Sequence, residues 1–299
     1  MVKTKAELVK YFRFGCEKQM EKILKFEDVE LCTESFGDEN NEAILLIMGA
    51  TSSMIWWDSK FCDKLAASGF HVIRYDNRDT GKSTCYGEGN LQYSIEDMVD
   101  DAIKILDYYK IEKANIVGIS LGGMIGELIS LEKPERVKTL TLISSSVFGP
   151  EDTRFPNIDK NILEYFNKII DLDWKDKKAV LDYIVKTWEI TSGETKKFEE
   201  NRIRKLAEEE FQRASDISSM TNHTLLDGGE KWYGRIGEIK VPVLIIHGTK
   251  DPIFPFEHAV ELNKLISGSK LLALEDTGHE FREDDWDTFI SGILELRNN

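Results

Sequence analysis

Short apolar runs alternate with longer amphipathic stretches along most of the chain. The short runs are rich in β-branched residues and bounded by Gly, Asp, Ser or Pro, so they predict strands; they are Ala43–Met48, His71–Tyr75, Ala114–Gly118, Thr139–Ile143, Val241–His247 and Lys270–Leu274. The longer stretches have apolar residues at helical spacing and predict helices over Asp58–Ser68, Ser94–Tyr109, Leu121–Glu132, His258–Ile266 and Asp285–Leu296. Strands alternating with helices predict an α/β fold with a mostly parallel sheet covered on both faces.

Three regions depart from this alternation. Val29–Phe36 alternates with period two and predicts an antiparallel strand at the sheet edge. Lys5–Lys25 predicts an additional amphipathic helix, to which we assign no function. Between Gly149 and Gly237 the strand signals vanish, and charge-rich helical patterns replace them over Asn161–Asp171, Lys177–Thr187 and Glu194–Ser215. We therefore expect a helical cap at residues 149–237, inserted into one sheet domain that is formed by residues 1–148 and 238–299.

One segment carries the pattern of a catalytic nucleophile. Gly118-Ile119-Ser120-Leu121-Gly122 lies directly after a predicted strand and directly before a predicted helix. This is G-x-S-x-G in the context where it forms a sharp strand-to-helix turn, whose strained serine needs glycine on both sides. Ser120 is therefore the candidate nucleophile, placed where the helix N-terminus favours developing negative charge. The alternative is a glycine-flanked serine that only caps the helix.

A serine hydroxyl needs a general base, and the base needs an orienting acid. In this architecture the chain order is Ser, acid, His. Asp251 follows the predicted strand Val241–His247, and His279 follows the predicted strand Lys270–Leu274. Both therefore lie at carboxyl ends of strands, where the site residues of open α/β sheets gather. They are the candidate acid and base.

Other residues compete for these roles. Asp251 precedes a proline and is also a typical turn residue. Asp276 is an alternative acid, but it lies on the same loop as His279 and is too close in sequence to reach around to the far ring nitrogen. His223 lies in the predicted cap and is a candidate for lining a pocket. The remaining histidines are expected in strands or in the first turn of a helix; they are His71, His247 and His258.

The reaction also needs donors for an oxyanion. The backbone N–H of Leu121, directly after the nucleophile, is one candidate, and the loop 49–53 after the first central strand should supply the other. By position we expect the N–H of Ala50, unless this loop is only a glycine-containing turn. Trp56 and Trp57 follow closely and are expected to help wall the pocket beside this loop.

Composition narrows the classes of function. The chain has 299 residues, 41% of them hydrophobic, and a net charge of −15. This apolar content excludes a disordered chain, and the acidic balance argues against nucleic acid or an anionic membrane as the main partner. No apolar run reaches the roughly 18 residues of a membrane span, and the first 25 residues lack the apolar core of a signal peptide. The four cysteines form no C-x-x-C pair. We expect a cytoplasmic protein without a metal site.

Two apparent cofactor motifs are incomplete. Thr80-Gly81-Lys82-Ser83 resembles the end of a P-loop, but the required earlier glycine is Asp76. Gly87 and Gly89 begin G-x-G-x-x-G, but the third position is Gln92. We therefore expect no cofactor.

From about Val29 to its end, the chain resembles the α/β-hydrolase family. Gly118–Gly122, Gly248–Asp251 and Gly278-His279 match its nucleophile elbow, acid loop and histidine loop. The segment His71–Ser83 and the cap segment Trp188–Gly193 are similar to aclacinomycin methylesterase-like hydrolases. Two positions depart from the commoner pattern: Asp79 replaces a glycine, and Met48-Gly49-Ala50 stands where His-Gly is usual.

The resemblance implies cofactor-independent hydrolysis of a carboxylic ester of a small apolar molecule, with a methyl ester as one candidate. The same three residues also serve proline iminopeptidase-like aminopeptidases, lactonases, C–C bond hydrolases and metal-free haloperoxidases. A ligand-binding receptor or signalling protein with residual hydrolase activity is the alternative outside enzymes. The sequence leaves the oligomeric state open.

Overall fold

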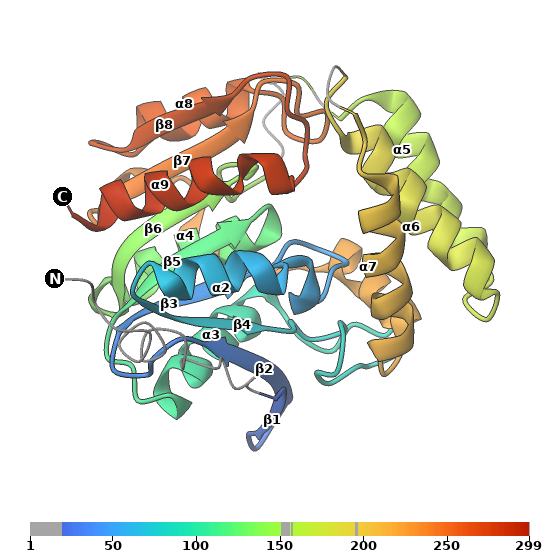
Figure 1. Cartoon of the computed structure of the whole chain (residues 1–299), viewed down its shortest axis with the longest axis horizontal. Coiled ribbons are helices and arrows are strands. Elements are labelled where there is room, and N and C mark those ends of the chain that lie inside the picture. Colours follow the sequence, from blue (N-terminus) through green and yellow to red (C-terminus); the bar gives the residue numbers. More distant parts are fainter. Residues whose placement is uncertain (1–19, 151–155, 157, 195–196, 299) are drawn as a thin grey trace, which may run out of the picture.

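An eight-stranded sheet runs through the centre of the protein, in a computed structural model that describes residues 20–150, 156, 158–194 and 197–298 (Figure 1). Its strand order is β1-β2-β4-β3-β5-β6-β7-β8. The strands are β1 Lys22–Lys25, β2 Glu30–Phe36, β3 Glu42–Ile47, β4 Phe70–Tyr75, β5 Ala114–Ile119, β6 Val137–Ile143, β7 Val243–Gly248 and β8 Lys270–Leu274. From β4 to β8 all neighbours are parallel, whereas β1 and β2 are antiparallel to their partners. The predicted α/β class and mostly parallel sheet are confirmed.

At the N-terminal edge one prediction was wrong, and a second was wrong in its last residues. The strand predicted at Val29–Phe36 is antiparallel, but it is not the edge, because β1 pairs with it from Lys22↔Thr33 to Lys25↔Glu30. The helix predicted over Lys5–Lys25 is contradicted at Lys22–Lys25, which form β1, whereas residues 5–19 lie outside the described part. Only Leu24 of β1 is buried, so the strand is held mainly by backbone pairing, which an apolar pattern does not reveal.

Helices cover both faces of the sheet, as expected. They are α2 Ser59–Ala67, α3 Ile95–Tyr108, α4 Leu121–Glu132, α8 Glu257–Leu265 and α9 Trp286–Arg297. Alternate strand residues point to opposite faces. On β3, Ile44 and Leu46 therefore join the apolar cluster of α2 and α9, whereas Leu45 and Ile47 join that of α3, α4 and α8.

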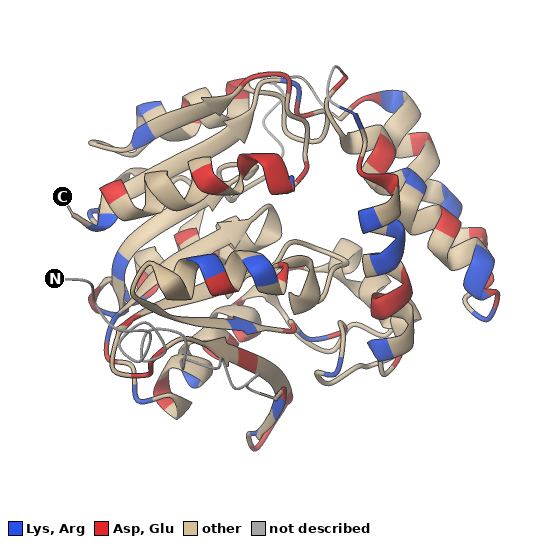
Figure 2. Ribbon diagram, viewed as in Figure 1, with Lys and Arg blue, Asp and Glu red and all other residues tan. Residues whose placement is uncertain are grey.

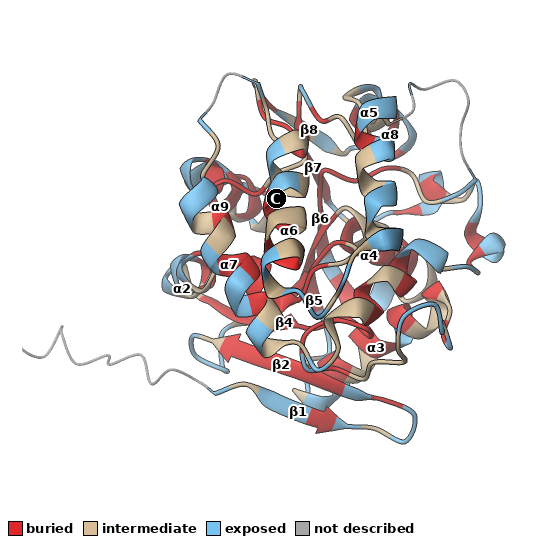
Figure 3. Cartoon of the chain, turned by 90° about the vertical axis from the view of Figure 1, so that its right-hand side faces the viewer, coloured by how far each residue is buried: buried red, intermediate tan, exposed pale blue. Residues whose placement is uncertain are grey.

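The segment between β6 and β7, which we call the β6–β7 insertion (residues 149–237), contains no strand in its described part. Its helices are α5 Lys160–Phe166, α6 Lys177–Thr191 and α7 Glu200–Arg213, followed by the 3-10 helical segment Ile217–Leu225. The last helix was predicted to begin at Glu194 but begins at Glu200, because the chain first turns at Ser192-Gly193 toward the loop after β8. α6 and α7 pack on each other beyond the end of the sheet (Figures 1 and 3).

The insertion contacts the loop after β8 with its own backbone atoms. The N–H of His279 donates to the carbonyl of Thr191 at 2.7 Å, and the N–H of Gly193 donates to Oε1 of Glu280 at 2.9 Å. A Cβ on Gly193 would lie 1.9 Å from the carbonyl oxygen of Asp276, and one on Gly278 would lie 2.2 Å from that of Thr191. Only glycine therefore permits this contact.

We predict that Gly193→Ala destabilises the protein by about 1–3 kcal/mol, because the new methyl group must push the two backbone segments apart. Gly149→Ala is the matched control, since its Cβ would meet nothing nearer than Tyr233 Cδ1 at 3.8 Å. Urea unfolding of both variants measures the difference. Equal midpoints would show that the contact adapts without cost.

Candidate active site

Ser120 occupies a sharp turn between β5 and α4. Its φ is 51° and its ψ is −120°, a left-handed conformation that is strained for a residue with a Cβ. The two flanking glycines make the turn possible: a Cβ on Gly118 would lie 2.1 Å from the carbonyl oxygen of Gly122, and one on Gly122 would lie 2.2 Å from that of Ile47. The helix thus packs directly against the ends of β5 and β3.

Hydrogen bonds from β6 and its following loop secure this turn. The N–H of Ser120 donates to the carbonyl of Ile143 at 2.9 Å, and the hydroxyl of Ser145 donates to the carbonyl of Ser120 at 2.9 Å. The backbone of Ser120 is therefore fixed on both sides, while its hydroxyl faces the pocket described below. Leu121 is the first residue of α4, so its N–H has no acceptor within the helix.

Asp251 and His279 meet across the loops after β7 and β8. Nδ1 of His279 is 2.7 Å from Oδ2 of Asp251, and Oδ1 of Asp251 accepts the N–H groups of Ile253 and Phe254 at 2.9 Å each. Burial alone would raise the pKa of Asp251, but the adjacent His279 imidazole and these hydrogen bonds hold it below its ordinary value. The carboxylate therefore accepts, His279 donates from Nδ1, and Nε2 remains for the pocket.

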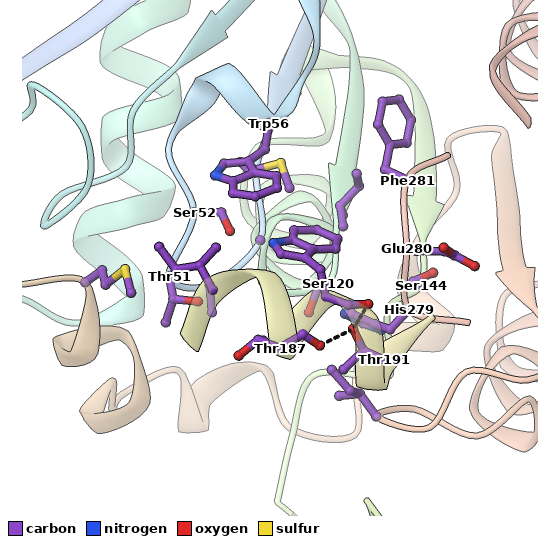
Figure 4. A pocket seen from close by; sticks show the side chains of 18 of the residues that line it. Thr51, Ser52, Trp56, Ser120, Ser144, Thr187, Thr191, His279, Glu280 and Phe281 are labelled. Atoms are coloured by element: carbon purple, nitrogen blue, oxygen red, sulfur yellow. Dashed lines mark hydrogen bonds between the residues drawn. The ribbon is translucent and has the colours of Figure 1, made fainter. Parts of the chain in front are cut away.

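A cavity of about 280 Å³ lies beside the predicted site residues (Figure 4). Its lining includes Ser120, His279 and Ala50, while Asp251 is buried behind His279. Leu121 is not among the lining residues, although it directly follows Ser120. Asp276, the alternative acid, donates its backbone N–H to the hydroxyl of Thr249. Ser120, Asp251 and His279, which follow one another in this order along the chain, thus lie at the carboxyl end of the sheet.

Aromatic and aliphatic side chains form most of the wall. Trp56 stacks on Trp188 of α6, with ring centroids 4.7 Å apart and an angle of 18° between the planes. The expectation that both adjacent tryptophans line the pocket holds for Trp56 only, because Trp57 is fully buried among Phe61 and Phe281. From the insertion the wall also receives Phe166, Ile169, Tyr183, Ile184 and Met220.

Two carboxyl groups in the lining were not predicted. Glu280 accepts the N–H of Gly193. Glu210 of α7 accepts from the hydroxyl of Ser53 at 2.5 Å and from Nε1 of Trp56 at 3.0 Å. Glu210 follows Glu208 and Glu209, and such a run normally forms a solvated face. The helical spacing was nevertheless informative, because Ile203, Leu206, Ala207 and Glu210 lie on one buried face of α7.

The other histidines occupy different environments. His71 is in β4 and His247 in β7, both buried, and His258 is in the first turn of α8. His223, the candidate for lining the pocket, lies instead one layer behind its wall and contacts the loop after β3. In the described part of the chain, no group of three or more His, Cys, Asp or Glu is placed to hold a metal ion.

The family model for the alpha/beta hydrolase fold matches residues 42–285. The chain belongs to this family. Its sheet, its strand-to-helix turn at Ser120 and the sequence resemblance stated above agree with that assignment. The prediction that the protein is a hydrolase is thereby confirmed.

Curated relatives within this family indicate which subgroup of hydrolases the chain resembles. The chain is 29% identical over 273 residues to rhodomycin D methylesterase DauP of Streptomyces sp. (strain C5), covering 86% of this chain and 91% of the relative. It is 28% identical over 273 residues to rhodomycin D methylesterase DnrP of Streptomyces peucetius, with the same coverage. The predicted resemblance to aclacinomycin methylesterase-like hydrolases is confirmed.

Among solved structures, an esterase from Exiguobacterium antarcticum has a TM-score of 0.74 and 21% sequence identity, covering 94% of this chain and 100% of that one. At this identity the likeness concerns the α/β-hydrolase fold. Among the described helices, none combines the length and the apolarity that crossing a membrane requires.

We predict that Glu210 makes stability fall as pH rises toward neutrality. Burial, assisted by the Asp76 carboxylate, raises the pKa of Glu210 to about 7 from an ordinary 4.5. Between these values the folded protein holds one proton more than the unfolded chain, so the free energy of unfolding decreases, and above pH 7 it levels off. The decrease should amount to roughly 3 kcal/mol, because each pKa unit corresponds to about 1.4 kcal/mol.

Calorimetry of the wild type and Glu210→Gln from pH 5 to 8 tests this assignment. The glutamine does not titrate. As the pH rises from 5 to 8, the melting temperature of Glu210→Gln should therefore increase relative to that of the wild type. Glu209→Gln removes a neighbouring exposed carboxylate and is the matched control. Parallel curves for wild type and Glu210→Gln would contradict the raised pKa.

Proposed function

We propose that this protein is a serine hydrolase that cleaves a carboxylic ester through Ser120, His279 and Asp251. The observation that carries the proposal is the pairing of His279 with Asp251 at 2.7 Å beside a pocket that Ser120 also lines. Serine acyl transfer requires a nucleophilic serine and a base oriented by an acid, so a strained Ser120 and a His279 paired with buried Asp251 support the proposal.

In the first half-reaction, Ser120 Oγ attacks the ester carbonyl while Nε2 of His279 accepts the hydroxyl proton. Asp251 holds the imidazole by Nδ1 and stabilises the imidazolium that forms. The carbonyl oxygen becomes an oxyanion, and we assign the N–H groups of Ala50 and Leu121 as its donors. The C–O bond to the alcohol then breaks, His279 protonates the leaving oxygen, and the acyl group remains on Ser120.

In the second half-reaction, His279 takes a proton from a water molecule, and the hydroxide attacks the acyl carbonyl. The bond to Ser120 breaks, and the proton returns from His279 to the serine oxygen. We further propose that the β6–β7 insertion is the cap of this site. Its side chains Phe166, Tyr183 and Trp188 wall the pocket, which excludes water from the acyl group.

The pocket favours an ester of a neutral, apolar acid. Its wall is mainly aromatic and aliphatic, and the carboxyls of Glu210 and Glu280 already accept hydrogen bonds from the protein. A substrate ammonium group would have to compete with these donors, which disfavours aminopeptidase activity. The methylesterases DauP and DnrP support the finer proposal that the ester is a methyl ester.

A fluorophosphonate probe should add its mass once to the wild type, at Ser120, because the activated hydroxyl attacks phosphorus as it attacks a carbonyl. Ser120→Ala should remain unmodified, whereas Ser144→Ala, which removes another hydroxyl of the same pocket, should still react. Intact-mass and peptide spectrometry give the result. An unmodified wild-type protein would refute the proposed nucleophile.

Substrate preference provides a second test. We expect Ser120-dependent turnover of the methyl ester of an aromatic acid, with a kcat/KM at least about tenfold above that for proline 4-nitroanilide, because the amine finds no free carboxylate. The reverse preference would favour the aminopeptidase alternative. Tight binding of the ester with negligible turnover would favour a receptor.

A further inference from the structure

The loop after β3, residues 49–56, lies against the nucleophile turn. A Cβ on Gly49 would come within 3.3 Å of Cβ of Ser120, so little space separates the two segments. Within this loop Thr51 has a φ of 59°, in the left-handed region that is costly for a β-branched residue. Such a conformation persists only where the surroundings hold it.

The side chain that holds Thr51 comes from the insertion. The N–H of Thr51 donates to Nδ1 of His223 at 3.0 Å, across 172 positions of sequence. The other ring nitrogen, Nε2, lies 2.8 Å from the carbonyl oxygen of Arg78. Because a carbonyl only accepts, Nε2 carries the proton, and Nδ1 is free to accept from Thr51. The ring is thus a neutral bridge between the loop after β3 and the loop after β4.

The environment of His223 favours this neutral form. The ring is buried, and burial lowers the pKa of His223 although the Arg78 carbonyl and the Asp79 carboxylate oppose the shift. Protonation at Nδ1 would replace the acceptor with a donor that faces the Thr51 N–H. The contact therefore depends on an unprotonated imidazole.

Other tethers hold the later part of the loop. Glu210 accepts from the hydroxyl of Ser53 and from Nε1 of Trp56, and Oδ1 of Asp76 accepts the N–H of Met54 at 2.9 Å. His223 is the tether adjacent to Ala50, whose N–H we assigned to the oxyanion. Without the Thr51 contact, the loop would still be held at residues 53–56, but the backbone at Ala50 would lose its orientation.

We propose that His223 is a positioning residue for the oxyanion: by accepting the Thr51 N–H it fixes the backbone at Ala50 beside Ser120. This inference rests on the proposed serine-hydrolase function and deepens it. It makes the insertion part of the catalytic arrangement as well as the wall of the pocket. If the imidazole only filled space, a variant that keeps a polar atom near the Nδ1 position and one that keeps it near the Nε2 position would have equal activity.

Two amide variants separate these roles. Asparagine can present its side-chain oxygen near the position of Nδ1, so His223→Asn retains an acceptor for Thr51. Glutamine reaches the position of Nε2, so His223→Gln retains the Arg78 contact and loses the acceptor. His223→Ala removes both, and His71→Ala, a buried histidine of β4 beside Tyr109, controls for the loss of an imidazole away from the pocket.

The readouts are kcat and KM for a 4-nitrophenyl ester, corrected for active sites by fluorophosphonate titration, and the inhibition constant of a boronic acid that forms a tetrahedral anion on the serine. Loss of an entire oxyanion donor costs about 10²–10³ in kcat. We expect His223→Gln and His223→Ala to lose about 10- to 100-fold in kcat, with KM nearly unchanged. The inhibition constant of the boronic acid should rise by a similar factor. His223→Asn should stay within about threefold of the wild type on the same scale, as should His71→Ala.

The outcomes are distinguishable. If the wild type hydrolyses esters through Ser120 but His223→Gln equals or exceeds His223→Asn in kcat, the positioning role is overturned and the proposed function stands. A fall in the number of titratable sites without a fall in kcat per site would likewise overturn it, since His223 would then serve folding alone. If the wild type shows no Ser120-dependent hydrolysis, the proposed function and this inference both fail.

Discussion

The close contact of β5 with α4 at Ser120 is the constraint on which the rest of the site depends. Gly118 and Gly122 leave no room for a Cβ between the strand and the helix, and Gly122 also touches the end of β3. This packing forces Ser120 into its left-handed conformation and directs its hydroxyl to the carboxyl edge of the sheet. The loop after β3 and the loop after β6 are then fixed around the same residue.

The insertion meets the sheet at the loops that surround Ser120. Thr191 and Gly193 at the end of α6 bond to the loop that carries His279, while Glu210 and His223 bond to the loop that carries Ala50. The apolar residues of α6 and α7 also continue the cluster formed by α2 and α9. The segment that lines the pocket therefore also restrains two loops of the proposed catalytic group.

The net charge of −15 has little direct part in the proposed chemistry, which uses the single carboxylate of Asp251. Acidic and basic residues are spread over the helices and loops, while the central strands carry few of them (Figure 2). In the acidic run of α7, Glu208 pairs with Lys177 at 2.6 Å and Glu209 is exposed. Glu210 alone turns inward, and its hydrogen bonds to Ser53 and Trp56 make it part of the wall. The pocket is thus apolar inside an acidic protein.

The sequence by itself determined the features that local patterns encode. The alternation of apolar runs predicted six of the eight strands as a parallel series and a seventh as antiparallel, and Gly118–Gly122 identified the turn at Ser120 from its immediate neighbours. Asp251 and His279 were found because each follows a strand, and parallel strands end at a common edge. These inferences needed only residues that are close in the chain.

The tertiary structure alone decided which distant segments touch. The apolar pattern does not reveal β1, because its stability comes from pairing with β2. It does not reveal the burial of Glu210 either, because a run of three glutamates normally indicates a solvated face, although Glu210 lies on the apolar face of α7. Nothing near His223 in sequence indicates that it accepts the N–H of Thr51. A buried polar group is stable only when specific partners satisfy it, and those partners are brought together by the folded chain rather than by sequence spacing.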